Sequence, residues 1–260
     1  MVSQHDVYCS RLVNGGIIGP HAQAFHRLGS EGRSSSALHG TVLCASSATS
    51  DKAMRAALRV VRRRLVRGFG DSHAQVARLG KTCILVAFDR VTRRPSVLAA
   101  LAAPGYVALT DSRSTQLPSG RRVTLSCMTL GPDCPPGSQV GASNLEVYPD
   151  PVLQIVVPGT YVKPGSARVD IVSTTGQPTV FYTLIGKGRR RWCAFTSSHV
   201  GSYSAIVLDN VVISDPLIQE AICGGQTQIA GLHSVNKAKQ LALFLNYGAH
   251  PVTLHAAGTQ

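Results

Sequence analysis

The feature that most constrains the fold is a series of short apolar segments between about residue 81 and residue 213, each separated from the next by turn-forming residues. Seven or eight short strands punctuated by Pro, Gly, Asp and Ser are typical of a β-sandwich or barrel, and not of alternating βαβ units. The expected strands cover residues 82–88, 105–109, 122–130, 152–157, 167–173, 179–185 and 192–195, and the last one covers 204–208 together with 211–213.

Helical periodicity lies on both sides of this region. Residues 50–68 predict the clearest helix, which Thr49, Ser50 or Asp51 can cap and which ends at Gly68. Spacing at 100° per residue gathers its apolar side chains on one arc and its arginines on the opposite arc, with Arg64 at the edge of that arc. The apolar arc holds Met54, Ala57, Leu58, Val61 and Leu65.

The two ends of the chain give weaker patterns. Asp215 and Pro216 favour the start of a helix that Gly224 and Gly225 end, and a second helix is expected over residues 235–246. The first 50 residues predict either short strands, one of them at 40–45, or partial disorder, and the tail from Gly248 is expected to be loose.

These patterns predict a mainly β protein, with a single jelly-roll-like β-sandwich, an N-terminal basic amphipathic helix and C-terminal helices. A chain of 260 residues with 44% apolar residues is long enough for one sizeable core. We therefore expect an N-terminal variable segment at 1–49, a basic helix plus β-sandwich core at 50–213, and a helical tail at 214–260.

The charge of the chain predicts a polyanionic partner, either a nucleic acid or an acidic membrane surface. Twenty-six Lys and Arg residues, 20 of them Arg, face 13 Asp and Glu residues, so the net charge is +13. Guanidinium groups bind phosphate through two parallel hydrogen bonds, which favours salt-sensitive RNA binding of low sequence preference. The predicted RNA-binding residues are Arg55, Arg59, Arg62, Arg63, Arg64, Arg67, Arg93, Arg94, Lys187, Arg189, Arg190 and Arg191.

The cysteines predict a reducing compartment. Their number, seven, is odd, and neither a regular spacing nor a CxxC motif is present, so we expect buried thiols and no disulfide framework. Cys127 and Cys134 lack a second pair of Cys or His at zinc-finger spacing, and we expect no metal or other cofactor. The first residues lack the layout of a secretion signal, and no run of 18 apolar residues predicts a spanning helix.

Catalytic motifs are incomplete, and we expect that the chain is not an enzyme. The segment 201–205 lacks the last Gly of a G-x-S-x-G elbow, and the segment around Lys187 lacks the upstream Gly and the following Ser or Thr of a P-loop. A chymotrypsin-like set of His73, Asp111 and Cys193 or Ser198 can be assembled on paper. Its nucleophile would lie in an apparent buried strand, without an oxyanion hole.

One motif carries a family resemblance. An apolar strand ends in Leu-x-Asp at Leu109 and Asp111, a polar loop follows, and further strands begin at Arg121. In a basic, strand-rich chain this arrangement resembles the thirty-kilodalton superfamily of plant-virus movement proteins, most closely the cucumovirus and umbravirus type. The resemblance covers residues 76–213, roughly half of the chain. It maps the family's near-constant Asp to Asp111, for which Asp89 is a rival.

This resemblance implies a function and a location. The protein would bind single-stranded RNA, self-associate, contact plasmodesmal or wall-associated membranes and proteins of the host, and carry a viral genome between cells. It would act in the host cell cytoplasm and in plasmodesmata. Two alternatives remain open from the residues alone: a capsid-like or nucleocapsid-like protein that packages RNA, and a matrix-type protein on an anionic membrane.

Overall fold

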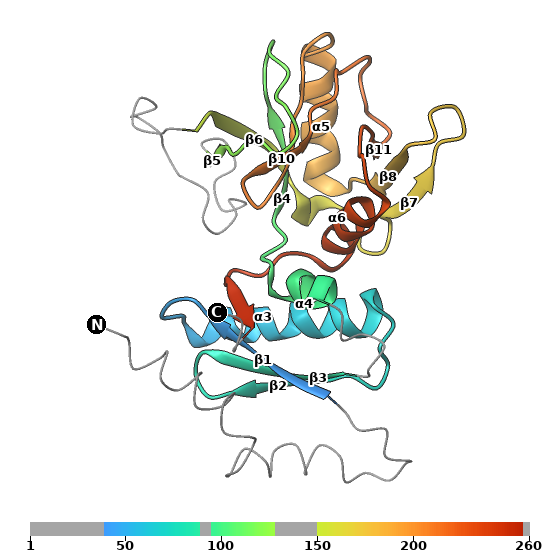
Figure 1. Cartoon of the computed structure of the whole chain (residues 1–260). Coiled ribbons are helices and arrows are strands. Elements are labelled where there is room, and N and C mark those ends of the chain that lie inside the picture. The colour runs from blue at the N-terminus through green and yellow to red at the C-terminus, as the bar shows by residue number, and fades with distance from the viewer. Residues whose placement is uncertain (1–38, 89–94, 128–149, 257–260) are drawn as a thin grey trace. The chain divides into compact units, whose positions relative to one another are not determined.

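The computed structural model describes residues 39–88, 95–127 and 150–256, and it confirms a mainly β protein (Figure 1). The chain divides into two compact units. Unit 1 comprises the described residues up to Pro104 together with those from His250 onward, and unit 2 comprises the described residues of Gly105–Ala249. This division differs from the expected boundaries at 49/50 and 213/214, because the end of the described chain returns to the first sheet.

Unit 1 is built on a four-stranded antiparallel sheet with strand order β12-β1-β3-β2. The order of elements is β-α-β-β-α-β, which with this strand order is the split βαβ or ferredoxin-like motif. Unit 2 is inserted between the second helix and the last strand. The elements of unit 1 are β1 (His39–Ala45), α3 (Asp51–Arg63) with the π-helical turn η1 (Arg64–Gly68), β2 (Gln75–Leu79), β3 (Cys83–Phe88), α4 (Pro95–Ala102) and β12 (Leu254–Ala256).

Both helices of unit 1 lie on one face of its sheet (Figure 1). Ile84, Val86 and Phe88 alternate along β3 and point toward the helices, as the period of two in a strand requires. Ser50 caps α3 by accepting a hydrogen bond from the backbone N–H of Ala53 at 3.2 Å. The helix therefore begins where the sequence predicted and buries the predicted apolar arc.

Unit 2 contains two sheets. A five-stranded sheet has the order β10-β9-β4-β6-β5, in which β5 and β6 are parallel, and a three-stranded antiparallel sheet has the order β11-β8-β7. The strands of the larger sheet are β4 (Val107–Asp111), β5 (Thr124–Ser126), β6 (Val152–Pro158), β9 (Ile206–Leu208) and β10 (Val211–Ser214). Those of the smaller sheet are β7 (Arg168–Ile171), β8 (Pro178–Thr183) and β11 (Gln226–Ile229).

Two helices and a short turn complete unit 2. Helix α5 (Gly186–Ser198) packs on β6 and on the 3₁₀ turn η5 (Gly159–Tyr161), and α6 (Val235–Tyr247) packs on β7 and β8. Asn246 fixes the end of α6, because its side chain both donates to and accepts from the backbone of Ala167, at 2.8 Å each.

Several expectations about the elements are corrected. The single jelly-roll-like β-sandwich is not confirmed, since the strands form three sheets in two units. Residues 192–195 belong to α5 and not to a strand, because Gly188, Trp192 and Thr196 recur every four residues and bury one helix face. No helix follows Asp215, because its carboxylate accepts hydrogen bonds from Ser112 and Leu117 instead of capping a helix.

The C-terminal part of the chain is confirmed in one half and corrected in the other. Helix α6 covers the predicted range 235–246. The tail after Gly248 is not loose over its described part, because Leu254–Ala256 pairs with β1. Helix α4 and strands β2 and β11 were not predicted.

Candidate functional site

The face of α5 that carries Ala194 borders an open cavity of about 370 Å³ in unit 2. The other wall comes from β6 and from the end of β4. The apolar floor is formed by Val156 and Phe195, and polar side chains surround it. Among the predicted site residues, Asp111 and Arg191 meet at this cavity, together with Gln154 and His199.

The polar groups around the cavity are held in place by their neighbours. The ring of His199 stacks on Phe195 with centroids 4.2 Å apart, and its Nδ1 lies 2.9 Å from the carbonyl oxygen of Phe195. Asp111 accepts a hydrogen bond of 2.9 Å from the backbone N–H of Arg113, and the guanidinium of Arg191 lies over the ring of Tyr161. The cavity thus offers fixed cationic, anionic and aromatic contacts around an apolar floor.

This arrangement does not assemble the chymotrypsin-like set considered above. Cys193 is in a disulfide, and the hydroxyl of Ser198 donates within α5 to the carbonyl oxygens of Ala194 and Phe195, at 3.0 and 3.1 Å. Among the described residues, no group of three or more His, Cys, Asp or Glu side chains is placed to hold a metal ion.

A second cavity, of about 480 Å³, lies beside Asp215. Ser112 Oγ donates to this carboxylate at 2.6 Å, and the backbone N–H of Leu117 donates at 2.7 Å. Burial raises the pKa of Asp215, and the two hydrogen bonds act in the opposite direction. Because Asp215 joins the loop after β4 to the end of β10, its carboxylate explains the local fold without a ligand.

The arginines of α3 and η1 form a cationic face, as the sequence predicted, with the exception of Arg64. Asp51 forms ion pairs with Arg55 and with Arg78, and it is the acidic residue in the first turn of α3. The exposed arginines of the face are Arg55, Arg59, Arg62, Arg63 and Arg67.

Arg64 departs from this face and is fully buried. Its guanidinium donates to the backbone oxygens of Ala100, Ala103 and Pro104 at 2.9, 2.6 and 2.8 Å. It therefore closes the end of α4 and is not a surface ligand for phosphate. The sequence carried a signal for this position, because Arg64 follows the buried Ala57 and Val61 by seven and three residues, which places it on the buried side of the helix.

The other predicted site residues are scattered. Lys187 and Arg189–Arg191 lie in the first two turns of α5, where a turn between strands was expected, and Leu109 is buried in β4. Arg93, Arg94 and Asp89 lie outside the described residues.

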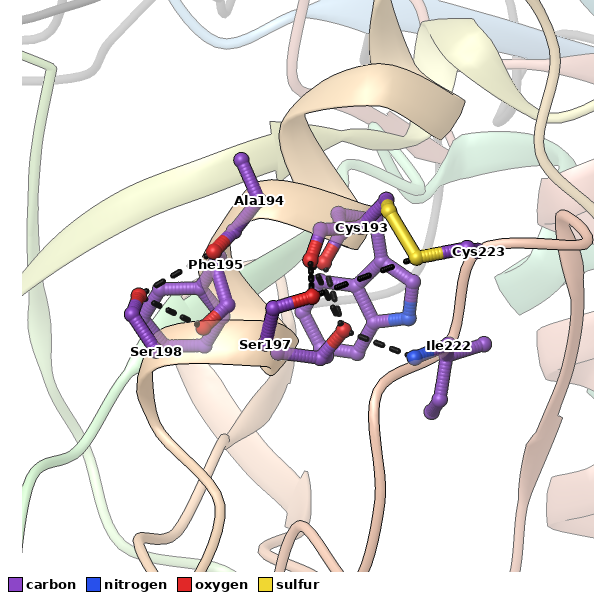
Figure 2. Close-up of a disulfide and its surroundings, with 9 residues drawn as sticks. Cys193, Ala194, Phe195, Ser197, Ser198, Ile222 and Cys223 are labelled. Atoms are coloured by element: carbon purple, nitrogen blue, oxygen red, sulfur yellow. Dashed lines mark hydrogen bonds between the residues drawn. A yellow bond between two sulfur atoms is a disulfide. The ribbon is translucent and has the colours of Figure 1, made fainter.

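Disulfides correct the prediction of reduced thiols. Cys44 and Cys83 face each other across β1 and β3 and are bonded, and Cys193 of α5 is bonded to Cys223 (Figure 2). Cys127 is disulfide-bonded as well. The number and spacing of the cysteines did not predict these pairs, because the fold brings together residues that are 39 and 30 positions apart in the sequence.

Among the described residues, no helix has the length and hydropathy that a membrane span requires.

The chain is similar in sequence to subunits of protein translocases. Residues 149–252 match the family described as SecDF, P1 head subdomain. The chain is 31% identical over 214 residues to the protein translocase subunit SecD of Rhodobacter capsulatus. The aligned stretch covers 78% of this chain and 34% of that protein. It is 42% identical over 82 residues to the protein translocase subunit SecDF of Thermus thermophilus, and this aligned stretch covers 32% of this chain and 11% of that protein. The chain thus spans between about a tenth and a third of these curated relatives.

Two solved structures share the fold. One, described as a membrane component SecDF that enhances protein export, has a TM-score of 0.60 and 21% identity, and the match covers 85% of this chain and 99% of that one. The other, SecDF in its super-membrane-facing form, has a TM-score of 0.63 and 24% identity, over 84% of this chain and 29% of that one.

These matches overturn the resemblance to plant-virus movement proteins. The Leu-x-Asp motif at Leu109 and Asp111 is the end of β4, where the carboxylate accepts a hydrogen bond from the following turn. The predicted viral function is wrong with it. So are the predicted partners, which were single-stranded RNA and the plasmodesmal or wall-associated membranes and proteins of a host, and the predicted location in host cytoplasm and plasmodesmata. The capsid-like and matrix-type alternatives are overturned by the same matches.

Proposed function

We propose that this chain is the part of a SecD-type protein translocase subunit that lies outside the cytoplasm and assists the export of polypeptides. The observation that carries the proposal is the match of residues 149–252 to the SecDF P1 head subdomain, which falls almost entirely within unit 2. A relative that matches a longer stretch, of 214 residues, is also a translocase subunit.

The disulfides support a location outside the cytoplasm. Disulfides form and persist in oxidising compartments, whereas cytosolic thiols are kept reduced. Two described pairs, Cys44–Cys83 in unit 1 and Cys193–Cys223 in unit 2, place such bonds in both units. An export subunit that acts on polypeptides after they cross the membrane would meet this environment.

The cavity beside α5 is the surface through which we propose that unit 2 contacts an exported polypeptide. Its floor of Val156 and Phe195, which are both partly exposed, can take apolar side chains, and Asp111, Arg191 and His199 can pair with polar or charged ones. Such a surface accepts many sequences, as an export factor requires. The role needs no catalytic group, so the expectation that the chain is not an enzyme is part of the proposal.

The experiment is a hybrid subunit. The matching stretch of Rhodobacter capsulatus SecD is replaced by this chain, and the hybrid is produced in cells of that organism depleted of their own SecD. We expect export of a secreted reporter protein to be restored. A hybrid that is produced and inserted at normal levels without restoring export would contradict the proposal.

The same hybrid tests the cavity by site-specific photocrosslinking. A photoreactive residue at Ala194, which is exposed on the cavity side of α5, should crosslink to a reporter arrested during export. Ser197 is the matched control, because it is exposed on the same helix but faces Cys223. Equal crosslinking from the two positions would contradict the assignment of this cavity.

A further inference from the structure

The two described disulfide pairs lie in opposite environments. Cys44 and Cys83 are 2% and 6% exposed, within neighbouring strands of the unit 1 sheet. Cys223 is exposed and Cys193 is half-buried. We therefore expect a reductant in solution to reach the disulfide at the exposed Cys223 without unfolding of the protein, but not the buried first pair.

The exposed disulfide ties an irregular segment to α5. Residues 215–225 connect β10 to β11 without forming a helix or strand, and Cys223 attaches them to the middle of α5 (Figure 2). Close to the disulfide, the backbone N–H of Ile222 donates to Thr196 Oγ1 at 2.9 Å. Residues 219–221 and 223–224 are exposed. The disulfide is thus the covalent hold on a segment that has few other attachments to the helix.

The surroundings favour the chemistry of exchange. Arg189 and Arg190 precede Cys193 by four and three residues and so lie one turn away along α5, which contains no acidic residue. The aliphatic part of Arg189 also lies against Gly225, where an added Cβ would be 3.0 Å from Arg189 Cδ. Cationic neighbours stabilise a thiolate, and a stabilised thiolate is a better leaving group in thiol–disulfide exchange.

We propose that Cys193–Cys223 is a reversible redox site that a thioredoxin-like dithiol reductant opens. A thiolate of the reductant attacks Cys223 Sγ, the bond between the two sulfurs breaks, and its electron pair leaves on Cys193 Sγ. In the mixed disulfide, one sulfur of the reductant is bonded to Cys223 Sγ. The second thiolate of the reductant then attacks that reductant sulfur and releases the thiolate of Cys223. The reductant becomes a disulfide by giving up two electrons and two protons, and this protein gains two thiols and frees residues 219–224 from α5.

The test uses the purified, oxidised full chain in the absence of denaturant. The protein is equilibrated with increasing dithiothreitol and then, separately, with a thioredoxin-type dithiol protein, and free thiols are alkylated and located by peptide mass. We expect Cys193 and Cys223 to be alkylated at reductant concentrations at least about tenfold lower than Cys44 and Cys83, which serve as the internal control. The fluorescence of Trp192, the single Trp of the chain and the neighbour of Cys193, should change over the same concentration range.

Three results would overturn the proposal. These are alkylation of the two pairs at the same concentration, alkylation of Cys193 and Cys223 without any reductant, and reduction of the pair with no increase in hydrogen exchange of residues 219–224. The double variant Cys193→Ser/Cys223→Ser should show the fast exchange of the reduced protein, and its Trp192 fluorescence should not respond to reductant.

A charge variant tests the role of the arginines. Arg189→Gln/Arg190→Gln should slow reduction of Cys193–Cys223 several-fold, whereas Arg168→Gln, at an exposed arginine of β7, should leave the rate unchanged. Equal rates in all three proteins would remove the arginines from the mechanism. The proposal does not depend on a role in export, because its tests use the purified chain and have no export readout.

Discussion

At the scale of single residues, Arg64 organises the end of α4. Helix ends leave backbone carbonyl groups without partners inside the helix, and in a buried place each of these groups needs a hydrogen-bond donor. Arg64 supplies donors to three carbonyl groups from one side chain. One of them belongs to Pro104, the last residue before the chain enters unit 2.

We expect Arg64→Met to destabilise unit 1 by about 3 kcal/mol or more, because the substitution leaves buried carbonyl groups without donors. The measurement is urea unfolding. Hydrogen exchange of the β3 amides is used as the probe, so that the stability of unit 1 is observed directly. Arg63→Met, at the exposed neighbouring position, is the control and should change the stability by less than about 0.5 kcal/mol. Similar losses in the two variants would contradict the assigned role of Arg64.

His250 makes unit 1 sensitive to acid. Its side chain is 3% exposed, and burial, with a further contribution from the charge of Arg64, lowers its pKa to about 4 from the usual 6.5. Hydrogen bonds with the backbone of Leu101, Val252 and Ala103 act in the opposite direction. The folded protein therefore holds this imidazole neutral at pH values where the unfolded chain would protonate it.

Because the unfolded state binds the additional proton between pH 6.5 and pH 4, the stability of unit 1 should fall as the pH is lowered through this range, by up to about 3 kcal/mol. The stability contribution is fully present above pH 6.5. The measurement is the free energy of unfolding of unit 1 against pH. His250→Gln should be less stable at neutral pH and should have a flatter profile, and an equally steep profile in this variant would assign the acid sensitivity to other groups.

At the scale of elements, α5 depends on one close approach to its neighbours. A Cβ added to Gly188 would lie 2.7 Å from Tyr161 Cγ, closer still to Tyr161 Cβ, and 3.3 Å from Val157 Cγ1. The glycine is thus required by packing against η5 and β6, although glycine weakens a helix when the helix is considered alone.

This conflict gives a prediction of opposite sign to helix propensity. Gly188→Ala should destabilise unit 2 by about 1–3 kcal/mol through overpacking, whereas propensity alone predicts a gain of about 1 kcal/mol. Unfolding followed by Trp192 fluorescence measures the effect in the same helix. Arg190→Ala, at an exposed position of α5, is the control, and a stabilised Gly188→Ala variant would contradict the packing argument.

The elements that the sequence predicted are those whose pattern is local. Strand β3 is a continuous apolar run, α3 has a cap and two clear faces, and α6 repeats Ala238, Leu241 and Leu245 at helical spacing. Helix α5 was misassigned because Trp192 and Phe195 resemble strand residues, and only contact with β6 fixes the segment as a helix. Asp215 was misassigned as a helix cap because its hydrogen-bond partners are also distant in sequence, about a hundred residues away.

At the scale of the whole molecule, the sequence predicted the β-rich class but not the division into units. Unit 1 depends on the pairing of β1 with β12, which lie near opposite ends of the described chain, and no local pattern reports such a pairing. The cationic face of α3 was predicted almost completely, whereas the cavity beside α5 was not. Asp111 and Arg191 were each identified for other reasons, and only the fold brings them together.

The disulfide of unit 1 should contribute to the stability of the molecule. Cys44–Cys83 closes a loop with a sequence separation of 39, for which the chain-entropy relation gives about 4 kcal/mol at most. We expect Cys44→Ala/Cys83→Ala to lower the stability of unit 1 by about 2–4 kcal/mol in chemical unfolding under oxidising conditions. In the presence of enough reductant to open both pairs, the variant and the parent protein should differ much less, and an unchanged difference would show that the loss comes from side-chain packing.

The hydrogen bond from the backbone N–H of His250 to the carbonyl oxygen of Pro104, at 3.1 Å, has a consequence for how such a protein can change over evolutionary time. The residues before and after the inserted unit are neighbours in space, so a short turn in place of Gly105–Ala249 would be enough to close the ferredoxin-like framework. Unit 2 can therefore become longer, become shorter or be replaced during evolution, while unit 1 keeps its own hydrogen bonds and core.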